Sequence, residues 1–179
     1  RPLNVICPDG TIFTANRPAP VSLYWETIMA AADLVWKALA PHIPERLPAG
    51  HFLSVCGTMI SGTHPVTGEY FLMVEPLVGG WGASFKSDGQ NGQFASADGE
   101  TYNIPIEILE TLYGIRVKQY TFHNEDGGHG EYRGGKGVVL ELEVLSEDAT
   151  LTASFGRHAS KPWPVGGAVS GTNNRIEIQ

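Results

Sequence analysis

Histidine is the residue of this sequence that can take part in the most kinds of chemistry, because imidazole transfers protons near neutral pH and also ligates metals. Six histidines are present: His42, His51, His64, His123, His129 and His158. His123 and His129 flank a glycine turn, but no two histidines have the spacing of helical metal ligands. We therefore expect no complete metal site in this segment, and we interpret the histidines as solvated or packed.

Nucleophilic and phosphate-binding motifs are incomplete. No Gly-x-Ser-x-Gly elbow occurs, and Ser54, Ser61 and Ser84 lie in unrelated contexts, so we assign no catalytic nucleophile. Gly130–Gly137 (GEYRGGKG) approaches a phosphate loop, but Gly137 replaces the hydroxyl residue that would bind magnesium. The next residues have strand periodicity, whereas a phosphate loop opens a helix. We predict that this loop does not bind nucleotide.

The run Gly79-Gly80-Trp81-Gly82-Ala83 allows two interpretations. Glycines let a backbone approach a ligand closely and turn N–H groups toward it, with Trp81 as the wall of a pocket. A tight bend with Trp81 in the core explains the same residues equally well.

Composition predicts one domain with an ordinary core. The chain has 179 residues, 42% of them hydrophobic, and a net charge of −7, which argues against a nucleic-acid surface. Cys7 and Cys56 form no CxxC pair, and we expect buried free thiols. No signal peptide or long apolar run is visible, which indicates no membrane segment and a cytoplasmic location. The chain begins at Arg1 on an apparent strand, as if within a longer polypeptide.

Sequence patterns predict an α+β fold, an antiparallel-rich sheet with one long and one short helix, in a single domain over residues 1–179. Tyr24, Ile28, Ala31, Val35 and Leu39 form a helical stripe after a Ser22 cap, with Trp25 and Trp36 off its centre. Pro105–Tyr113 predicts the short helix, with Asn103 satisfying free N–H groups at its start.

Strands are predicted wherever apolar residues run or alternate. The predicted strands are Leu3–Cys7, Thr11–Phe13, His51–Cys56, Tyr70–Val74, Ile115–His123, Val138–Val144, a returning strand through Leu151, Ala153 and Phe155, and a last one at Ile176 and Ile178. Gly57–Gly68 is predicted to be a Gly/Thr-rich loop. The stretch 76–100, rich in glycine, predicts a long functional loop.

Several motifs, in this order along the chain, resemble the C-terminal region of the hydantoinase B/5-oxoprolinase family. They are Pro8-Asp9-Gly10-Thr11, Pro18-Ala19-Pro20-Val21, Gly79–Ala83, Asp88-Gly89, Asn103–Glu110, Tyr113–Val117, Gly127–Gly137, Pro162-Trp163 and Gly166-Gly167. Each glycine motif alone is weakly specific, but the ordered set covers nearly the whole chain.

The resemblance implies a multi-subunit, ATP-dependent enzyme. In this family a hydantoinase A-like partner binds ATP and phosphorylates the carbonyl oxygen of the small-molecule substrate. The B-type subunit then completes hydrolysis of a cyclic amide or carboxylation of a ketone enol. A divalent metal is possible, with ligands outside this segment. The resemblance therefore implies a hetero-oligomer that includes the remainder of the B-type polypeptide.

The resemblance also implies a substrate pocket at Gly79, Gly80, Trp81 and Gly82, with Asp88, Asn103 and Glu107 close by. Trp81 departs from the smaller residue of many relatives. The Asn103-Ile104-Pro105 sequence favours the hydantoinase-like branch, hence hydrolysis of a hydantoin, lactam or oxoproline-type ring. The alternatives are a component of a ketone carboxylase and a non-catalytic assembly subunit.

Overall fold

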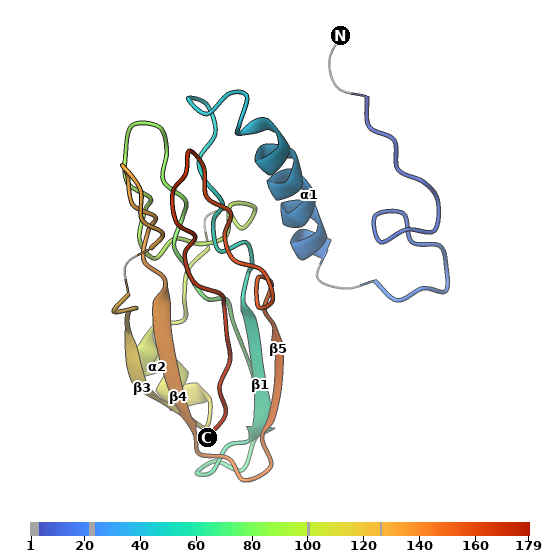
Figure 1. The fold of residues 1–179 in the computed structure, drawn as a ribbon. Coiled ribbons are helices and arrows are strands. Elements are labelled where there is room, and N and C mark those ends of the chain that lie inside the picture. Colours follow the sequence, from blue (N-terminus) through green and yellow to red (C-terminus); the bar gives the residue numbers. More distant parts are fainter. Residues whose placement is uncertain (1–3, 22–23, 100, 126) are drawn as a thin grey trace.

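The structure, a computed structural model, describes residues 4–21, 24–99, 101–125 and 127–179. Within these ranges it confirms an α+β fold with two helices and antiparallel sheets (Figure 1). The elements are α1 (Tyr24–Leu39), β1 (Gly57–Thr63), β2 (Tyr70–Glu75), α2 (Ile106–Leu112), β3 (Ile115–Phe122), β4 (Val138–Val144) and β5 (Thr150–Ser154). The strands form two sheets, one with the order β2-β1-β5 and one with β3 and β4.

The first strand lies later in the chain than predicted. His51–Cys56 is not a strand, and Gly57–Thr63, predicted to be a loop, forms β1 at the centre of its sheet. The backbone explains the shift, because Leu53 and Cys56 adopt φ values of 47° and 48°, which an extended strand excludes. The small residues of β1 hide its alternation, and the strand is recognisable mainly through its partners on both sides.

The prediction of β2 is confirmed, and its alternation decides which face is buried. Phe71 and Met73 point into the core, whereas Tyr70, Leu72 and Val74 are exposed. Ile60 of β1 pairs with Met73 and shares the buried face. The hairpin therefore buries one face and leaves an apolar outer face.

The strands β3, β4 and β5 are confirmed, but they do not form one continuous sheet. β4 pairs with β3, whereas β5 pairs with β1. The connection at residues 145–149 therefore carries the chain from one sheet to the other. Local alternation predicts that a strand exists, but its partner depends on contacts distant in the sequence.

Helix α1 is confirmed, but three residues of the stripe used to predict it, Ile28, Val35 and Leu39, face outward. Ile28 is 57% exposed and Val35 48%, whereas the buried positions are Met29 and Asp33. The sequence pattern misassigned the face because Asp33 counts as polar although its carboxylate is paired inside the protein. The Ser22 cap lies outside the described residues.

Helix α2 is confirmed as a short helix, with Pro105 at its N-cap position and without a side-chain cap. Asn103 does not cap it, contrary to the prediction. Its side-chain amide instead donates to Glu75 Oε1 and to the Pro76 carbonyl. The helix starts after the proline because Pro105 fixes the backbone there.

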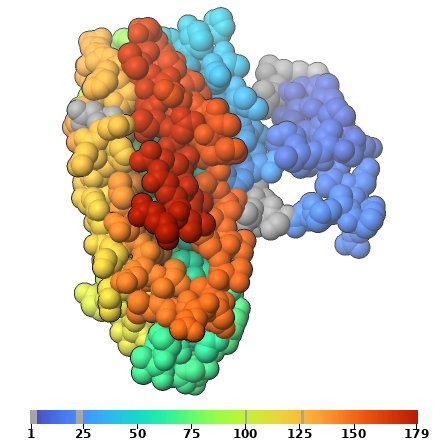
Figure 2. Space-filling view, turned by 60° about the horizontal axis from the view of Figure 1, so that its bottom comes forward, coloured from blue at the N-terminus to red at the C-terminus, as the bar shows by residue number. Residues whose placement is uncertain are grey.

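The described residues at the two ends of the chain form no strand. Asn4–Cys7 and Thr11–Phe13 belong to an arm that stands apart from the body (Figures 1 and 2), and Leu3 lies outside the described residues. Asp9 and Gly10 form the predicted turn, in which the Gly10 N–H donates to the Thr14 carbonyl. Ile176 and Ile178 are exposed in an extended segment without a strand partner among the described residues.

Two separate clusters form the core. One lies under α1 and contains Met29, Phe52, Val55, Cys56 and Ala95. The other joins the sheets to α2 and contains Ile60, Phe71, Met73, Leu109 and Ile115. Neither helix combines the length and the hydropathy that crossing a membrane requires, in the part of the chain that the structure describes.

Candidate functional site

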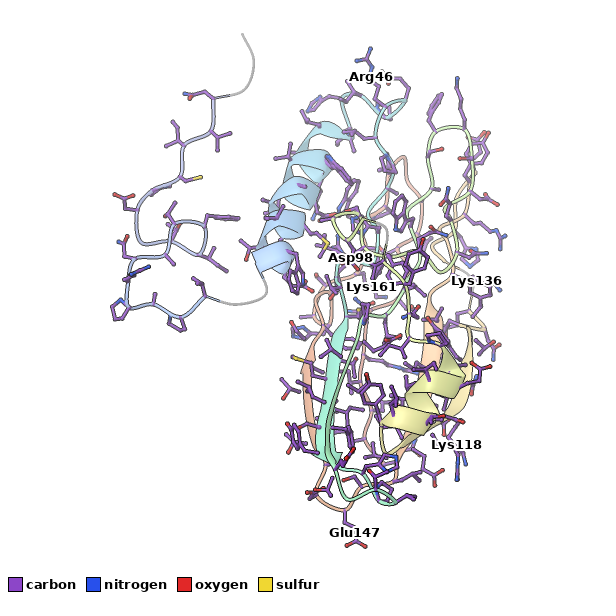
Figure 3. The ribbon with its side chains drawn as sticks, turned by 180° about the vertical axis from the view of Figure 1, so that it is seen from behind. Arg46, Asp98, Lys118, Lys136, Glu147 and Lys161 are labelled. Carbon is purple, nitrogen blue, oxygen red and sulfur yellow. The ribbon has the colours of Figure 1, made fainter. Side chains whose placement is uncertain are left out.

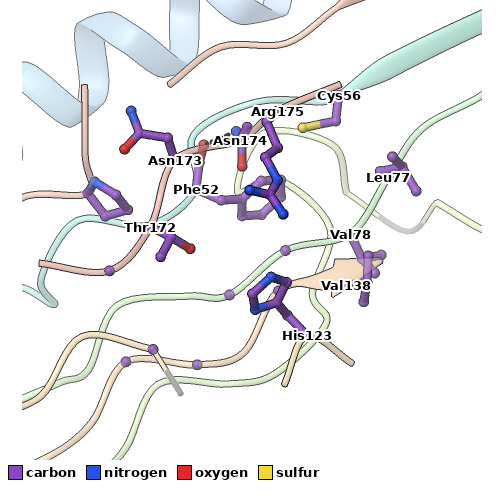
Figure 4. Close-up of a pocket in the computed structure, with 18 of the residues that line it drawn as sticks. Phe52, Cys56, Leu77, Val78, His123, Val138, Thr172, Asn173, Asn174 and Arg175 are labelled. Carbon is purple, nitrogen blue, oxygen red and sulfur yellow. Dashed lines mark hydrogen bonds between the residues drawn. The ribbon is translucent and has the colours of Figure 1, made fainter. Parts of the chain in front are cut away.

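A cavity of about 1650 Å³ opens between the glycine-rich loops, the strands β4, β1 and β5, and the last residues of the chain. Figure 4 shows its interior, where Phe52, Val78 and Val138 supply apolar walls. A large concave site that combines apolar walls with polar groups is the usual form of a ligand pocket. This cavity is therefore the candidate site of the chain.

The predicted pocket run Gly79–Gly82 lies in the wall of this cavity. Its glycines are required by contacts of the chain with itself. A Cβ on Gly80 would lie 2.0 Å from the Gly135 carbonyl oxygen, and one on Gly82 would lie 1.9 Å from the Ala49 carbonyl oxygen. A Cβ on Gly79 would meet the Phe52 ring at 2.3 Å. The absence of side chains lets neighbouring segments pack backbone to backbone and so shapes the wall.

Backbone-to-backbone contacts also join the loops around the cavity. Trp81 donates its N–H to the Gln90 carbonyl at 3.0 Å and accepts from the Gly135 N–H at 2.9 Å. Gly79 and Gln93 exchange two hydrogen bonds of 2.8 Å. The long stretch 76–100, predicted to be a loop, is therefore ordered by backbone hydrogen bonds to distant segments.

Trp81 lines the cavity with 36% of its surface exposed. Its indole Nε1–H donates to the Phe94 carbonyl at 2.8 Å, and its ring centroid lies 6.5 Å from that of His51. One edge of the indole is thus fixed by a hydrogen bond, and the ring remains accessible to a ligand. This arrangement agrees with a wall more closely than with a fully buried core residue.

Asp88, Asn103 and Glu107 do not line the cavity with Gly79–Gly82. Asp88 accepts from the Arg133 backbone N–H at 2.9 Å and from its Nε at 3.1 Å. The backbone hydrogen bond from Arg133, followed by its side-chain hydrogen bond, lowers the pKa of Asp88. Glu107 is exposed on α2, where its carbonyl accepts from the Thr111 hydroxyl.

Asn103 belongs to a separate polar cluster with Glu75 and Tyr120. The Glu75 carboxylate is 4% exposed and accepts hydrogen bonds from Asn103 and from the Ile104 N–H. Burial raises the pKa of Glu75, although the hydrogen bonds from Asn103 and Ile104 oppose it. Tyr120 donates to Asn103 Oδ1 at 3.1 Å, and burial followed by the charge of Glu75 raises the pKa of its phenol. The cluster ties β2, β3 and the start of α2 together.

A second buried network connects α1 to the loops. Arg157 Nη2 lies 2.8 Å from Asp33 Oδ2, and the two side chains are only 7% and 5% exposed. Trp163 Nε1 donates to the other oxygen of Asp33 at 2.8 Å, and Arg157 Nε donates to the His51 carbonyl at 2.9 Å. The pairing satisfies a charge that would otherwise be costly to bury, so the network is a structural anchor.

His51 is buried beside this anchor, and its hydrogen bonds define its tautomer. Its Nδ1 accepts from the Leu53 N–H at 3.0 Å, so the proton of a neutral ring is on Nε2, 3.3 Å from Ser96 Oγ. Burial lowers the pKa of His51, opposed by the charge of Asp33 and assisted by that of Arg157. A ring that donates to Ser96 cannot also accept its proton, so this pair is not a serine–histidine nucleophile.

The described residues offer few groups that could bind a metal ion or a nucleotide. Within residues 4–21, 24–99, 101–125 and 127–179, no group of three His, Cys, Asp or Glu residues could hold a metal ion. Gly130–Gly137 leads directly into strand β4, and the Lys136 N–H donates to Asn91 Oδ1 at 2.8 Å. A loop followed by a strand has no helix N-terminus for a phosphate. That this loop does not bind nucleotide stays a prediction.

The cysteines differ from each other. Cys56 is buried at the cavity, as predicted for free thiols, whereas Cys7 is exposed on the arm, so that prediction is wrong for Cys7. Burial raises the pKa of Cys56 to about 12, against a hydrogen bond with Ser54 that lowers it. A thiol that stays protonated at neutral pH is a poor nucleophile.

The cavity also contains residues that the sequence did not single out, above all Arg175 and Asn174. His123, interpreted from the sequence as solvated or packed, lines it as well. The position of His123, at the end of a predicted strand and before a glycine turn, could have indicated a site residue. No pattern in the sequence indicated that Arg175 lines the cavity, because its position depends on the path of residues 172–179 across the fold.

Comparison with known proteins identifies the family. The family model described as Hydantoinase B/oxoprolinase matches residues 1–179, so the chain belongs to this family. The chain is 29% identical over 164 residues to a putative D-/L-hydantoinase B-type polypeptide of a Pseudomonas strain, covering 91% of this chain and 27% of that protein. It is 34% identical over 184 residues to the beta subunit of the caprolactamase of Pseudomonas jessenii, covering 95% of this chain and 29% of that protein.

A solved structure shares the fold. The nucleotide-free structure of acetone carboxylase, from a study of ATP-dependent acetone carboxylation, superposes with a TM-score of 0.64 at 22% identity. The match covers 82% of this chain and 21% of that chain. The chain thus spans less than a third of the relatives and the structure it matches.

Proposed function

We propose that this chain is part of the B-type subunit of an ATP-dependent enzyme that opens a cyclic amide. The observation that carries the proposal is the similarity, over 95% of the chain, to the beta subunit of a caprolactamase. Similarity to the B-type polypeptide of a hydantoinase supports the same reaction class. The substrate is then a small molecule with a hydantoin, lactam or oxoproline-type ring.

An amide is a poor electrophile, and ATP would supply the activation. Phosphorylation of the carbonyl oxygen would make the carbonyl carbon electrophilic, so that water adds there and the ring C–N bond breaks to release the amine. A second water would then hydrolyse the acyl phosphate to the carboxylate and inorganic phosphate. We assign ATP binding to a hydantoinase A-like partner subunit, since the described part of this chain offers no recognisable nucleotide motif. Because ATP is a co-substrate, we place the hetero-oligomer in the cytoplasm.

Within this proposal the cavity beside Gly79–Gly82 forms part of the substrate pocket. Trp81 would supply an apolar wall and exclude water that would hydrolyse an activated intermediate too early. The glycine segments would hold that wall rigid through their backbone contacts. Asp88 would support the rim indirectly through Arg133.

The test is reconstitution of the full-length B-type polypeptide with an A-type partner. We expect ATP-dependent consumption of a hydantoin, a lactam or 5-oxoproline by the pair, and none by either polypeptide alone. Consumption of acetone or acetophenone that requires bicarbonate would replace the hydrolase by the ketone carboxylase, which the shared fold with acetone carboxylase favours. If the A-type polypeptide alone turned over the substrate, the B-type polypeptide would be an assembly component.

Two variants of Trp81 test the pocket. Trp81→Phe keeps an aromatic wall, whereas Trp81→Ala opens it, and both lose the bond to the Phe94 carbonyl. If the wall contacts substrate, Trp81→Ala should change the ratio of kcat/KM between a small and a large ring much more than Trp81→Phe. Equal changes for all substrates would place the pocket elsewhere.

A further inference from the structure

Arg175 holds a special position in the cavity. Among the described residues that line it, Arg175 is the only lysine or arginine, whereas several glutamates, including Glu141, lie along the same walls. Figure 4 shows its guanidinium directed into the interior, on the side of the cavity where His123 is labelled. A cation is thus placed at one point of an otherwise acidic and apolar cavity.

The segment that carries Arg175 is fixed from several sides. The Asn174 side-chain amide donates to the carbonyls of Phe52 and Gly156, each at 2.9 Å. The preceding Asn173 donates to the His158 carbonyl at 2.8 Å. Because these bonds hold the backbone immediately before Arg175, its side chain leaves from a defined point, which reduces the entropy lost when it binds a ligand.

The guanidinium retains capacity for a ligand. Its Nε lies 3.3 Å from Glu177 Oε1, while neither Nη1 nor Nη2 has a hydrogen-bond partner among the described residues. The Arg175 side chain is 73% exposed, so a small molecule can reach it. The planar fork of arginine matches the two oxygens of a carboxylate or phosphate.

His123 supplies a second donor. Its Nδ1 accepts from the Glu125 N–H at 3.2 Å, which leaves the proton of a neutral ring on Nε2. In Figure 4 the ring lies in the same part of the cavity as the Arg175 guanidinium, next to Val138. Two donors and an apolar wall in one cavity are the features of a site that orients a small ligand.

We propose that Arg175, assisted by His123, binds a small-molecule oxyanion, a carboxylate or a phosphoryl group, in this cavity. The proposal deepens the proposed function, because opening an amide by water produces a carboxylate and the activated intermediate carries phosphate. Arg175 is then a substrate- or product-binding residue of the cavity, and His123 its hydrogen-bonding partner. The Glu177 carboxylate pairs with the Arg175 guanidinium until the ligand displaces it.

The experiment measures binding at Arg175 without any use of turnover. The assembled, full-length protein is treated with phenylglyoxal, which modifies accessible arginines, and modification is followed residue by residue by peptide mass spectrometry. The probes are sodium acetate and inorganic phosphate, and acetamide is the neutral control of the same shape as acetate. Arg46, which is exposed and is not among the residues that line the cavity (Figure 3), is the internal control residue.

We expect acetate or phosphate at ten times its dissociation constant to slow modification of Arg175 about tenfold, by mass action. Acetamide should not protect Arg175, and no probe should protect Arg46. The probe that protects at the lower concentration identifies the ligand group, carboxylate for acetate and phosphoryl for phosphate. Equal protection by acetate and acetamide, or no protection by either anion, would overturn the proposal.

Two variants sharpen the result. His123→Leu removes the donor at similar size and should raise the half-protecting concentration about tenfold, as loss of a charged hydrogen bond does. Glu177→Gln removes the internal competitor and should lower that concentration. Opposite or absent shifts in both variants would refute the assigned geometry. If anions protect Arg175 but the reconstituted enzyme does not turn over cyclic amides, the proposed function is rejected and the anion site stands. If the enzyme turns over cyclic amides but anions do not protect Arg175, the anion site is rejected and the proposed function stands.

Discussion

The two halves of the molecule are held together by different means. In the strand half, made of β1 to β5 and α2, side chains such as Phe71 and Met73 interlock in an apolar core. In the loop half, made of α1 and residues 44–56, 77–99, 127–137 and 156–175, glycine segments pack backbone to backbone. A buried ion pair between Asp33 and Arg157 joins these loops to α1.

The difference shows two ways to specify a packed structure. In the strand half the packing is specified by large side chains, because their alternation along a strand determines which face is buried. In the loop half it is specified by the absence of side chains at glycines such as Gly80, Gly82 and Gly135, where an added Cβ would collide with a neighbouring backbone. The cavity lies on the loop side of this division and extends onto β4 and β1.

The largest expected effect is loss of the buried anchor in the loop half. Asp33→Ala leaves the Arg157 guanidinium buried without its partner and should lower the free energy of unfolding by about 4 kcal/mol. Glu143→Ala, which removes the exposed ion pairs with Arg116 and Lys118 in the strand half, should cost at most about 1 kcal/mol. Denaturant titration followed by tryptophan fluorescence measures both. Equal losses would contradict the structural role of the anchor.

The core of the strand half should respond to a cavity almost as strongly. Met73 is fully buried, and Met73→Ala should cost about 3 kcal/mol through lost burial and the void left behind. The neighbouring Leu72→Ala, on the exposed face of the same strand, is the control and should change stability by about 0.5 kcal/mol or less. A reversed order in the same titration would mean that the outer face of β2 is the buried one.

Adding one methyl group tests the glycine packing of the loop half. Gly80→Ala places a Cβ against the Gly135 carbonyl and should cost about 2 kcal/mol by overpacking. Gly137→Ala meets no atom within 4 Å and should lie within about 0.5 kcal/mol of the parent. Thermal unfolding of both variants measures the contrast. An unchanged melting temperature for Gly80→Ala, with a loss of turnover, would show that the glycine serves a ligand instead.

The smallest expected effect is a pH dependence at the connection between the sheets. Hydrogen bonds from the Ser146 hydroxyl, and then from the N–H and hydroxyl of Thr63, lower the pKa of Asp148 to about 2. Because the folded pKa lies below the ordinary value of about 3.9, the charged carboxylate stabilises the fold above pH 4 and loses this effect as the pH falls toward 2.

Asp148→Asn should therefore be slightly less stable than the parent at pH 5, with a difference that shrinks between about pH 4 and 2. Unfolding curves collected across this range measure the difference. A constant gap at every pH would show that the charge of Asp148 contributes nothing. Ser146→Ala, which removes one donor, should show the same trend at smaller amplitude.

Prediction from the sequence succeeded where side-chain pattern and local propensity agree. The strands at Tyr70 and Val138 and the helix after Pro105 are examples. It failed at β1, where small residues conceal alternation, and at α1, where a paired aspartate lies on the buried side. For the cavity, the sequence led to Gly79–Gly82 and Trp81 but missed Arg175, and Asp88, Asn103 and Glu107, which it grouped with them, are not among the residues that line the cavity.

Local patterns in the sequence were sufficient to predict the α+β class, most strands, both helices and the hydantoinase B/oxoprolinase family, because periodicity and ordered motifs are local properties. The pairing of β4 with β3 and of β5 with β1, and the packing of Gly80 and Gly82 against Gly135 and Ala49, became visible in the folded structure alone. The folded structure also shows that Arg175 and His123 line one cavity. These outcomes depend on contacts between residues far apart in the chain, which no local pattern encodes.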